Sequence, residues 1–347
     1  MKRFIFLLTL FIFLTGFSFG QADLQPVARV NLLRTETISV RQLRSEIEKM
    51  EKATGATLNN AQKREVLDAM INERLALQAA ERDKITVTEN EINRQIEEHK
   101  REMVEFLGRP PTDSEFAAAV KGQTDLEMPA FREQLRRSLV LQKFIRAKKG
   151  NVLENIRPPT DREITDMYNL TKSQFTRPDT VRFSMIQVPY GNDAASRTRA
   201  KELIDRLHRE IGNNPSRFDE AVLKGQAPNS GYQAGDGSYL PRNLEAAQIV
   251  GQNFINIAFG LSQGQVSGVI EGIPGFQIIK ITETYVQKNL ELNDIFQPGR
   301  RETVREYIRA LMMQQKQAEA FERATTELFT ELRAEKTFEV FERNLPW

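Results

Sequence analysis

Apolar residues recur at helical spacing over much of the 347-residue chain. The clearest pattern lies between about Asn60 and Lys84, where one face carries Val66, Leu67, Met70, Ile71 and Leu75. A second pattern runs from Ala194 to Ile211. A third runs from about Arg300 to Arg333, with a stripe of Val304, Ile308, Leu311, Ala318, Phe321, Leu328 and Leu332. Each pattern predicts an amphipathic helix that buries its apolar face.

The starts of four expected helices share one signature. A Ser or Thr stands three residues before a Glu or Gln at Ser39 and Gln42, Thr88 and Glu91, Thr112 and Glu115, and Thr160 and Glu163. In such a capping box, the two side chains accept hydrogen bonds from the free backbone N–H groups of the first turn. Helices should therefore dominate up to about Met167, interrupted by proline-containing hinges at 108–111 and 156–159.

Two short strand patterns lie near the ends of the chain, at Val27 to Leu33 and at Thr337 to Glu342. We expect these two segments to pair with each other. Gln315 and Thr325 interrupt the seam that a coiled coil would need, so the long C-terminal helix should pack against the N-terminal helices. Together, these expectations predict a discontinuous helical domain.

The segment between Val181 and Tyr285 has a different pattern. Extended apolar runs at 181–189 and 274–281 flank the helix at 194–211 and a predicted glycine-rich turn at 235–239. This order is typical of a compact α+β unit. The predicted fold class is therefore α+β, with a mostly helical discontinuous domain (N-terminal helices plus C-terminal helix and strand) and one smaller α+β domain.

The predicted domain boundaries follow from these patterns. A signal peptide covers 1–20, an N-terminal helical domain 21–175, and the α+β domain 176–288. The C-terminal helix and strand at 289–347 complete the N-terminal domain. A chain of this length exceeds what one core usually serves, so more than one domain is expected.

The first residues have the pattern of a secretory signal. Lys2 and Arg3 precede an almost unbroken apolar run from Phe4 to Phe19, and small residues follow near Gly20. A membrane anchor is the alternative, but the run is short for a membrane span of about 20 residues. We therefore expect export by a cleavable signal peptide and a soluble periplasmic protein, with a membrane-proximal position left open.

Composition excludes several classes of function. The chain has no cysteine, so neither a disulfide nor lipid attachment at cysteine is possible. Removing Lys2 and Arg3 from the 49 basic residues leaves 47 against 47 acidic ones, a balance that does not suit nucleic acid. Gly264 to Gly268 lacks the lysine of a phosphate-binding loop. Two dispersed histidines support neither a hydrolase triad nor a metal site, so no cofactor, metal or nucleotide is expected.

The order of pieces in the central segment resembles the parvulin family of peptidyl-prolyl isomerases (rotamases). The run at 181–189 is similar to the first parvulin strand, and 227–236 to the approach to its glycine turn. Phe254 to Leu261 is similar to its Phe-x4-Phe-x-Leu helix, and 264–281 to its closing strand. This resemblance implies a parvulin-like fold over about a hundred residues.

The polar residues of that family are missing here. The resemblance places Met185 where the first family histidine is expected and Gln277 at the second. Ala227 stands at the acid or thiol, and Pro274 at the hydroxyl. The two histidines present, His99 and His208, fall in charged helical patterns away from these positions. No catalytic residue is therefore assigned.

What the resemblance retains is apolar. Phe254 and Phe259 match the family's ring-binding aromatic residues, and Val250 stands where a methionine is usual. The predicted substrate-binding residues are Met185, Tyr239, Val250, Phe254, Phe259 and Phe276. Isomerisation has a barrier of about 20 kcal/mol that desolvation of the imide lowers, so an apolar groove alone could retain activity. Alternatively, Phe254 and Phe259 only fill the core.

The whole plan resembles exported chaperones of the SurA, PpiD and PrsA type. The segment 69–75 and the following 85–92 are similar to the N-terminal domain of SurA, and the absence of cysteine favours the soluble SurA-like form. The resemblance implies a holdase for unfolded or nascent envelope proteins, with a role in protein folding and outer-membrane biogenesis. An active isomerase with an apolar groove and an envelope scaffold protein are the alternatives.

Overall fold

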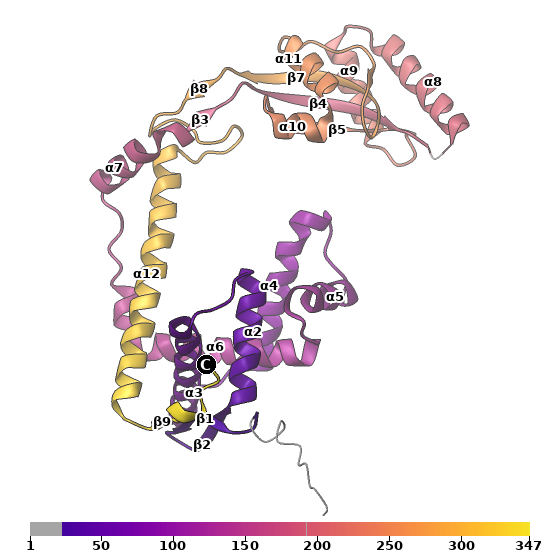
Figure 1. Cartoon of the computed structure of the whole chain (residues 1–347). Coiled ribbons are helices and arrows are strands. Elements are labelled where there is room, and N and C mark those ends of the chain that lie inside the picture. Colours follow the sequence, from indigo (N-terminus) through magenta and orange to yellow (C-terminus); the bar gives the residue numbers. More distant parts are fainter. Residues whose placement is uncertain (1–22, 192) are drawn as a thin grey trace, which may run out of the picture. The chain divides into compact units, whose positions relative to one another are not determined.

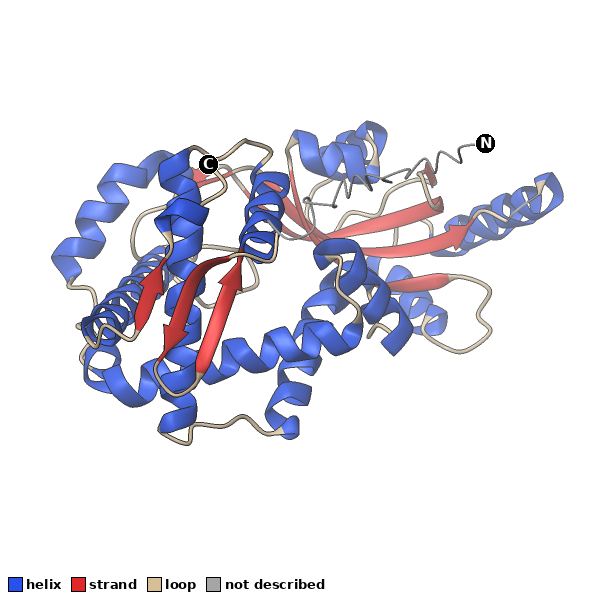
Figure 2. Cartoon of the chain, turned by 60° about the horizontal axis from the view of Figure 1, so that its bottom comes forward, coloured by secondary structure: helices blue, strands red, loops and turns tan. Residues whose placement is uncertain are grey.

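The computed structural model of the chain describes residues 23–191 and 193–347, so the predicted signal peptide lies outside the described residues. The chain divides into two compact units. The first contains the chain up to Arg157 together with 316–347, and the second contains 158–315. Helices and strands both contribute throughout, in agreement with the predicted α+β class (Figures 1 and 2).

The first unit is mostly helical, with one small sheet. Its helices are α2 (Val40–Thr54), α3 (Asn60–Arg82), α4 (Glu89–Leu107), α5 (Asp113–Thr124), α6 (Met128–Glu154) and the later part of α12 (Val304–Ala334). The sheet has the order β2-β1-β9 and consists of β2 (Thr35–Ser39), β1 (Pro26–Asn31) and β9 (Phe338–Val340). The short 3₁₀ helix η2 (Glu342–Asn344) follows β9.

The two ends of the chain meet in this sheet. β1 pairs antiparallel with β9, placing Ala28 opposite Val340 and Val30 opposite Phe338. The C-terminal turns of α12 pack on α3 and α6 through the buried residues Ala324, Leu328 and Leu332, which share a core with residues of both helices. The predicted pairing and the predicted discontinuous helical domain are therefore confirmed.

Polar contacts also hold the C-terminal part of α12 against α3 and α6. The Arg333 guanidinium donates to Asn72 Oδ1 at 2.7 Å and to Asp68 Oδ1 at 2.6 Å. Lys149, which interrupts the helical geometry of α6, places its ammonium 2.6 Å from a carboxylate oxygen of Glu331. The hydrogen bond that Lys149 donates to Glu331 raises the pKa of Lys149, so the lysine stays charged although it is mostly buried.

One side chain holds the turn between β1 and β2. Gln78 on α3 is fully buried, and its Oε1 accepts the backbone N–H groups of Leu32, Leu33 and Arg34 at 3.2, 2.9 and 3.3 Å. Without this oxygen, three backbone donors at the inner side of the turn would lose their partner. Gln78 therefore ties the hairpin, and with it the strand that receives β9, to α3.

The four predicted capping boxes are confirmed at the starts of α2, α4, α5 and α7 (Asp161–Thr171). The structure adds two more that the sequence patterns did not reveal. Asn59 and Gln62 cap α3 in the same reciprocal way. Thr303 and Glu306 exchange the same pair of hydrogen bonds at the start of α12. Because Thr303 caps it, α12 begins at Val304 rather than at about Arg300.

The second unit is built on a four-stranded sheet of order β5-β4-β7-β6. Its strands are β4 (Thr180–Pro189), β5 (Gln233–Pro241), β6 (Ile270–Glu271) and β7 (Gly275–Tyr285). Helices α8 (Ala194–Ile211) and α9 (Pro215–Gly225) share one core with the sheet, and α10 (Leu244–Val250) and α11 (Gln252–Gly260) share another.

A third core of this unit lies where the chain enters and leaves the sheet. It contains residues of α7, of the link between η1 and β3, of the segment after β8 (Lys288–Asn289) and of the first turns of α12, namely Ile164, Tyr168, Phe175, Leu290, Val304 and Ile308. The 3₁₀ helix η1 (Lys172–Gln174) and the short strand β3 (Thr176–Arg177), which pairs with β8, connect this core to the sheet.

Two expectations about local structure are wrong. Gly235 to Tyr239 belongs to strand β5 instead of a turn, because Gly237 is needed for close packing: a Cβ there would come within 2.6 Å of the Phe183 carbonyl oxygen. The stripe predicted along the C-terminal helix also fails, since Leu311 is 49% exposed and Ala318 is exposed. The first and last turns of α12 enter different cores, so no single stripe runs along the helix.

We predict that replacing Gln78 with leucine destabilises the first unit by roughly 1–3 kcal/mol, because backbone donors of the turn lose their acceptor. The single tryptophan, Trp347, packs against the core of this unit, so its fluorescence during urea unfolding reports on it. Gln123→Leu, at an exposed position of α5, is the matched control and should change the free energy of unfolding by less than about 0.5 kcal/mol. Equal effects of the two changes would show that Gln78 does not tie the turn.

Candidate functional site

The positions that match the parvulin histidines lie on neighbouring central strands. Met185 on β4 is opposite Ile279 on β7, and Gln187 is opposite Gln277. Met185 packs against the core that α10 and α11 form on this side of the sheet. The sheet therefore places Met185 and Gln277 two residue positions apart along adjacent strands.

Four of the predicted substrate-binding residues are brought together here. Met185, Val250 and Phe259 are half-buried and pack on the core that contains Phe254. Phe254 is only 3% exposed and meets the Phe183 ring edge-on at 5.4 Å. Phe254 thus has the burial of a core residue, while its three neighbours offer the apolar surface. Their role in binding stays a prediction.

Gln277 is buried and polar. It is 5% exposed, and its Nε2 donates to Gln187 Oε1 at 3.2 Å. Its Oε1 has no hydrogen-bond partner in the described part of the chain. An amide neither gains nor releases a proton near neutral pH, so Gln277 cannot act as a general acid or base. The Gln277 side chain can offer its amide oxygen as a hydrogen-bond acceptor near Met185.

The remaining two substituted positions lie at the edge of this region. Ala227 lines a surface hollow of about 510 Å³ together with Pro189 and Tyr232. Gln233 and Ala234 line this hollow and also a smaller one of about 130 Å³ beside Met185, so the two adjoin. The Pro274 carbonyl accepts the backbone N–H of Tyr190 at 3.3 Å. Neither residue offers a titratable group.

Tyr239 and Phe276 are not part of the apolar cluster. Phe276 belongs to the core under α8 and meets the Tyr190 ring edge-on at 5.0 Å. The Tyr239 hydroxyl donates to Glu283 Oε2 at 3.4 Å, and the Arg182 guanidinium lies 5.5 Å from its ring centroid. The structure therefore separates these two predicted residues from the other four.

Histidine chemistry is absent from the parvulin-like positions. His99 lies on α4 of the first unit, with its ring centroid 6.4 Å from that of Phe131. His208 lies on the last turn of α8. Among residues 23–191 and 193–347, no group of three His, Cys, Asp or Glu side chains could hold a metal ion, and no helix there has the length and apolarity of a membrane span.

The first unit contains an apolar groove that the sequence patterns did not predict. It has a volume of about 840 Å³ and lies between α6 and the C-terminal part of α12, with contributions from α2, α3 and the segment before α6. Its apolar lining consists of Leu126, Ala130, Leu141, Ile145, Phe321 and Phe329. Phe321 is 36% exposed, and Leu141 and Phe329 are half-buried. In the sequence, the only indication of this groove was that Phe321 belongs to the apolar stripe expected along α12.

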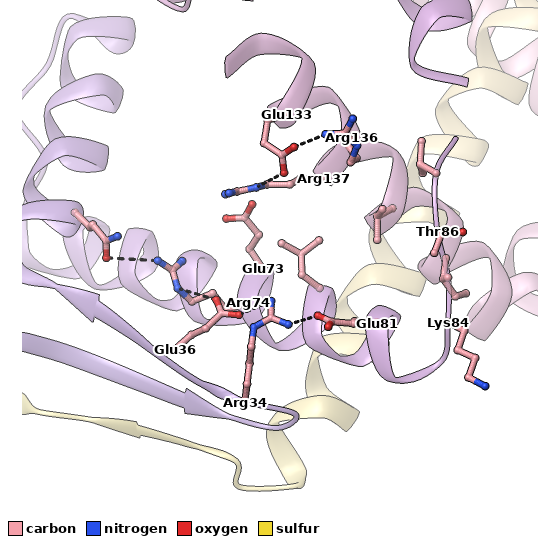
Figure 3. Close-up of a pocket in the computed structure, with 15 residues that line it drawn as sticks. Arg34, Glu36, Glu73, Arg74, Glu81, Lys84, Thr86, Glu133, Arg136 and Arg137 are labelled. Carbon is pink, nitrogen blue, oxygen red and sulfur yellow. Dashed lines mark hydrogen bonds and ion pairs between the residues drawn. The ribbon is translucent and has the colours of Figure 1, made fainter. Parts of the chain in front are cut away.

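A second hollow of about 570 Å³ lies beside β2 and α3 (Figure 3). Its apolar side chains are Leu77, Ile85, Val87 and Val140, and charged residues surround them. These charges mostly neutralise one another: Arg34 pairs with Glu36 and Glu81, and Glu133 lies between Arg136 and Arg137 (Figure 3). Such a rim favours neither a positive nor a negative ligand, whereas the apolar residues at its centre can contact an apolar side chain.

Comparisons with known families agree with this architecture. Residues 1–145 match the SurA-like N-terminal domain, and residues 159–295 match the PPIC-type PPIase domain. The first match lies in the N-terminal part of the first unit and leaves out 316–347, and the second match lies within the second unit. The chain thus combines a SurA-like N-terminal domain with a PPIC-type parvulin domain.

The chain is also similar to individual proteins. The chain is 26% identical over 311 residues to the foldase protein PrsA of Clostridium botulinum strain Loch Maree, covering 88% of this chain and 80% of that protein. It is 30% identical over 228 residues to the chaperone SurA of Alcanivorax borkumensis, covering 63% of this chain and 47% of that protein. A solved structure of a SurA-like chaperone from Campylobacter jejuni matches 91% of this chain and 98% of its own at 15% identity, with a TM-score of 0.34.

Tyr239 and Tyr285 both donate hydrogen bonds to Glu283, and the titration of Tyr285 tests this network. The Tyr285 hydroxyl donates to Glu283, and this hydrogen bond raises the pKa of Tyr285 to about 12. Glu283→Gln removes the charge that opposes ionisation, so we predict that the pKa of Tyr285 falls toward 10 in the variant. NMR of the ¹³Cζ atoms of the six tyrosines measures this directly. A Tyr285 signal that titrates identically in both proteins would contradict the network.

Proposed function

We propose that this protein is a periplasmic holdase-type chaperone that binds unfolded envelope proteins, outer-membrane proteins among them. The observation that carries this proposal is the groove of about 840 Å³ in the first unit, where Phe321, Phe329 and Leu141 present apolar surface between helices. Exposed apolar surface bounded by polar residues is typical of a protein-binding site. The periplasmic protein Cj1289 and the virulence factor PEB4 are described as SurA-like chaperones, which is consistent with this role.

The parvulin-type domain contributes binding rather than catalysis in this proposal. The positions of the family's polar residues hold Met185, Ala227, Pro274 and Gln277. None of them has a side chain that titrates near neutral pH, and Met185 and Gln277 are largely enclosed by the sheet and its helices. The half-buried Met185, Val250 and Phe259 supply a second apolar surface for an extended client.

One observation favours an alternative, an isomerase without polar catalytic groups. Met185, Val250, Phe254 and Phe259 form a single apolar cluster, and Gln277 lies two residue positions from Met185 along the neighbouring strand. An apolar wall desolvates a prolyl imide, which lowers part of the barrier of about 20 kcal/mol. Binding and isomerisation therefore need separate tests.

We predict that Leu126→Ser combined with Phe321→Ser weakens client holding. The two changes remove apolar contacts from the groove but lie outside the buried core, so folding should be retained. Because part of the Phe and Leu contacts is lost, a chaperone concentration about fivefold higher should be needed to halve the aggregation of the client. Light scattering of a chemically unfolded envelope protein, diluted into residues 21–347 of this chain, measures that concentration.

Leu33→Ser is the matched control for the groove variant, because Leu33 is 48% exposed in the same unit but does not line the groove. It should leave the half-suppression concentration unchanged. If the control and the groove variant protected the client as well as the parent protein does, the groove would not be the holding surface. If the parent protein gave no protection, the chaperone proposal itself would fail.

For proline isomerisation, we predict a rate at the uncatalysed background in a protease-coupled assay with a proline peptide. The physical reason is that none of the side chains at the matched positions, Met185, Ala227, Pro274 and Gln277, exchanges a proton near neutral pH. A rate clearly above background that falls when Phe259 is changed to Ala would instead establish the apolar isomerase. Phe259 suits this test because it is half-buried, whereas Phe254→Ala would cost roughly 3–5 kcal/mol of core packing.

A further inference from the structure

A separate hollow of the second unit lies where β3 and β8 lead into the sheet. Its volume is about 560 Å³. Its apolar and aromatic lining consists of Phe175, Pro178, Tyr239, Pro241, Leu290, Phe296 and Pro298. It shares no residue with the apolar cluster around Met185, so it is distinct from the parvulin-like face.

The walls of this hollow are held in place by close packing. Gly299 has a φ of +78°, and a Cβ there would come 2.4 Å from the Tyr239 ring, so only glycine lets the segment from Phe296 to Gly299 lie against Tyr239. Phe296 stacks on Tyr307 at 4.1 Å and meets Phe175 edge-on at 6.0 Å. A rigid aromatic wall binds a ligand without first losing conformational freedom.

The permanent charges that line the hollow are all positive. Arg177 and Arg300 are its charged residues, and no Asp or Glu lines it. The Arg177 guanidinium lies 5.0 Å from the Tyr285 ring centroid, and its Nη2 donates to the Val286 carbonyl at 3.3 Å. Its buried Nε has no partner within the described chain. Arg300 is exposed, and neither arginine forms an ion pair with a described residue.

Neighbouring acids are already engaged elsewhere. Asp294 pairs with Lys288 at 2.6 Å and accepts the backbone N–H of Glu291 at 2.7 Å. These contacts lower the pKa of Asp294, and the charge of Arg177 adds a smaller effect. Asp179 accepts the backbone N–H of Gln287 at 2.7 Å. Glu283 accepts from Arg182 and Tyr285. Asp294 therefore opposes the charge of Arg177 only at a distance, and neither Arg177 nor Arg300 has an ion-pair contact with an acid of the described chain.

We propose that this hollow binds a carboxylate-bearing stretch of an extended polypeptide, with an aromatic or proline side chain of that stretch against Phe296 and Tyr239. Two arginines without acidic partners complement a carboxylate, and guanidinium groups bind carboxylates in a planar, directional way. The inference rests on the proposed chaperone function and adds a selectivity to it: among unfolded clients, segments that combine acidic and aromatic residues are preferred. The carboxylate can come from an Asp or Glu side chain or from the end of a chain.

Fluorescence anisotropy with short labelled peptides tests this proposal on residues 21–347. The first peptide has a Glu-Phe-Pro-Glu centre and an amidated end, and the second replaces both Glu with Gln. The third keeps Gln but ends in Phe with a free carboxylate. We expect the first to bind about fivefold more tightly than the second. Tight binding of the third peptide as well would assign the carboxylate to a chain end as well as to a side chain.

Variants connect that preference to the hollow. Arg177→Gln combined with Arg300→Gln should remove the preference for the acidic peptide, and Arg177→Lys should reduce it by weakening the directional contact. Arg301→Gln is the matched control, because Arg301 is the exposed neighbour of Arg300 and does not line the hollow. An unchanged preference in the folded double variant would overturn the proposal, as would equal binding of all three peptides by the parent protein.

This outcome is separable from that of the chaperone proposal. If the parent protein suppresses aggregation but shows no acidic preference, only the selectivity is wrong. If it selects the acidic peptide but suppresses no aggregation, the hollow is a peptide site and the holding function is wrong. Far-UV circular dichroism of each variant during heating shows whether a lost preference comes from lost folding.

Discussion

The structure of the helical unit depends on the return of the last thirty or so residues to the first ones. Strand β9 completes a sheet begun by β1, and the end of α12 fills the core between α3 and α6. Arg333 and Lys149 add charged contacts that leave little freedom in how α12 docks. Residues 23–157 therefore share their core with the end of the chain, and the parvulin-type domain is an insertion into a domain that starts before it and ends after it.

This arrangement separates two kinds of surface in one chain. The helical unit has a groove with apolar side chains between packed helices, and the parvulin-type unit has an apolar cluster that includes Met185, Val250 and Phe259. Both surfaces are made of side chains that are only partly covered. In the proposed function, the free energy for holding an apolar segment would come from removing apolar area from water.

Much of the fold could be predicted from local patterns. The helix at 194–211 has the predicted bounds, the capping boxes lie where the Ser or Thr and the Glu or Gln indicated, and the two ends pair as expected. Strand β5 was missed because Gly235 and Gly237 are typical of turns, and only the nearby Phe183 shows why the strand needs glycine at Gly237. Grooves could not be predicted, since they depend on which helices meet. Phe321 has the same periodicity whether it is covered or exposed.

The candidate site illustrates the same limit. Residue matching placed Met185, Phe254 and Phe259 in one region, but it could not separate Tyr239 and Phe276, which the sheet turns into other environments. Neighbouring residues on a strand point to opposite faces, so similarity along the sequence does not fix which side of the sheet a residue serves. The sequence also could not show that Arg177 and Arg300 lack ion pairs. Whether an arginine is paired depends on acids from distant segments of the chain.

The repeated capping boxes have a consequence for the order of assembly. Each of these helix starts is satisfied by side chains within three positions of the cap, so it needs nothing from the far end of the chain. Early helices can therefore form with the right boundaries while the C-terminal segment is still being synthesised. The N-terminal boundaries of these helices are therefore set by local contacts, whereas their packing still depends on the final strand and helix.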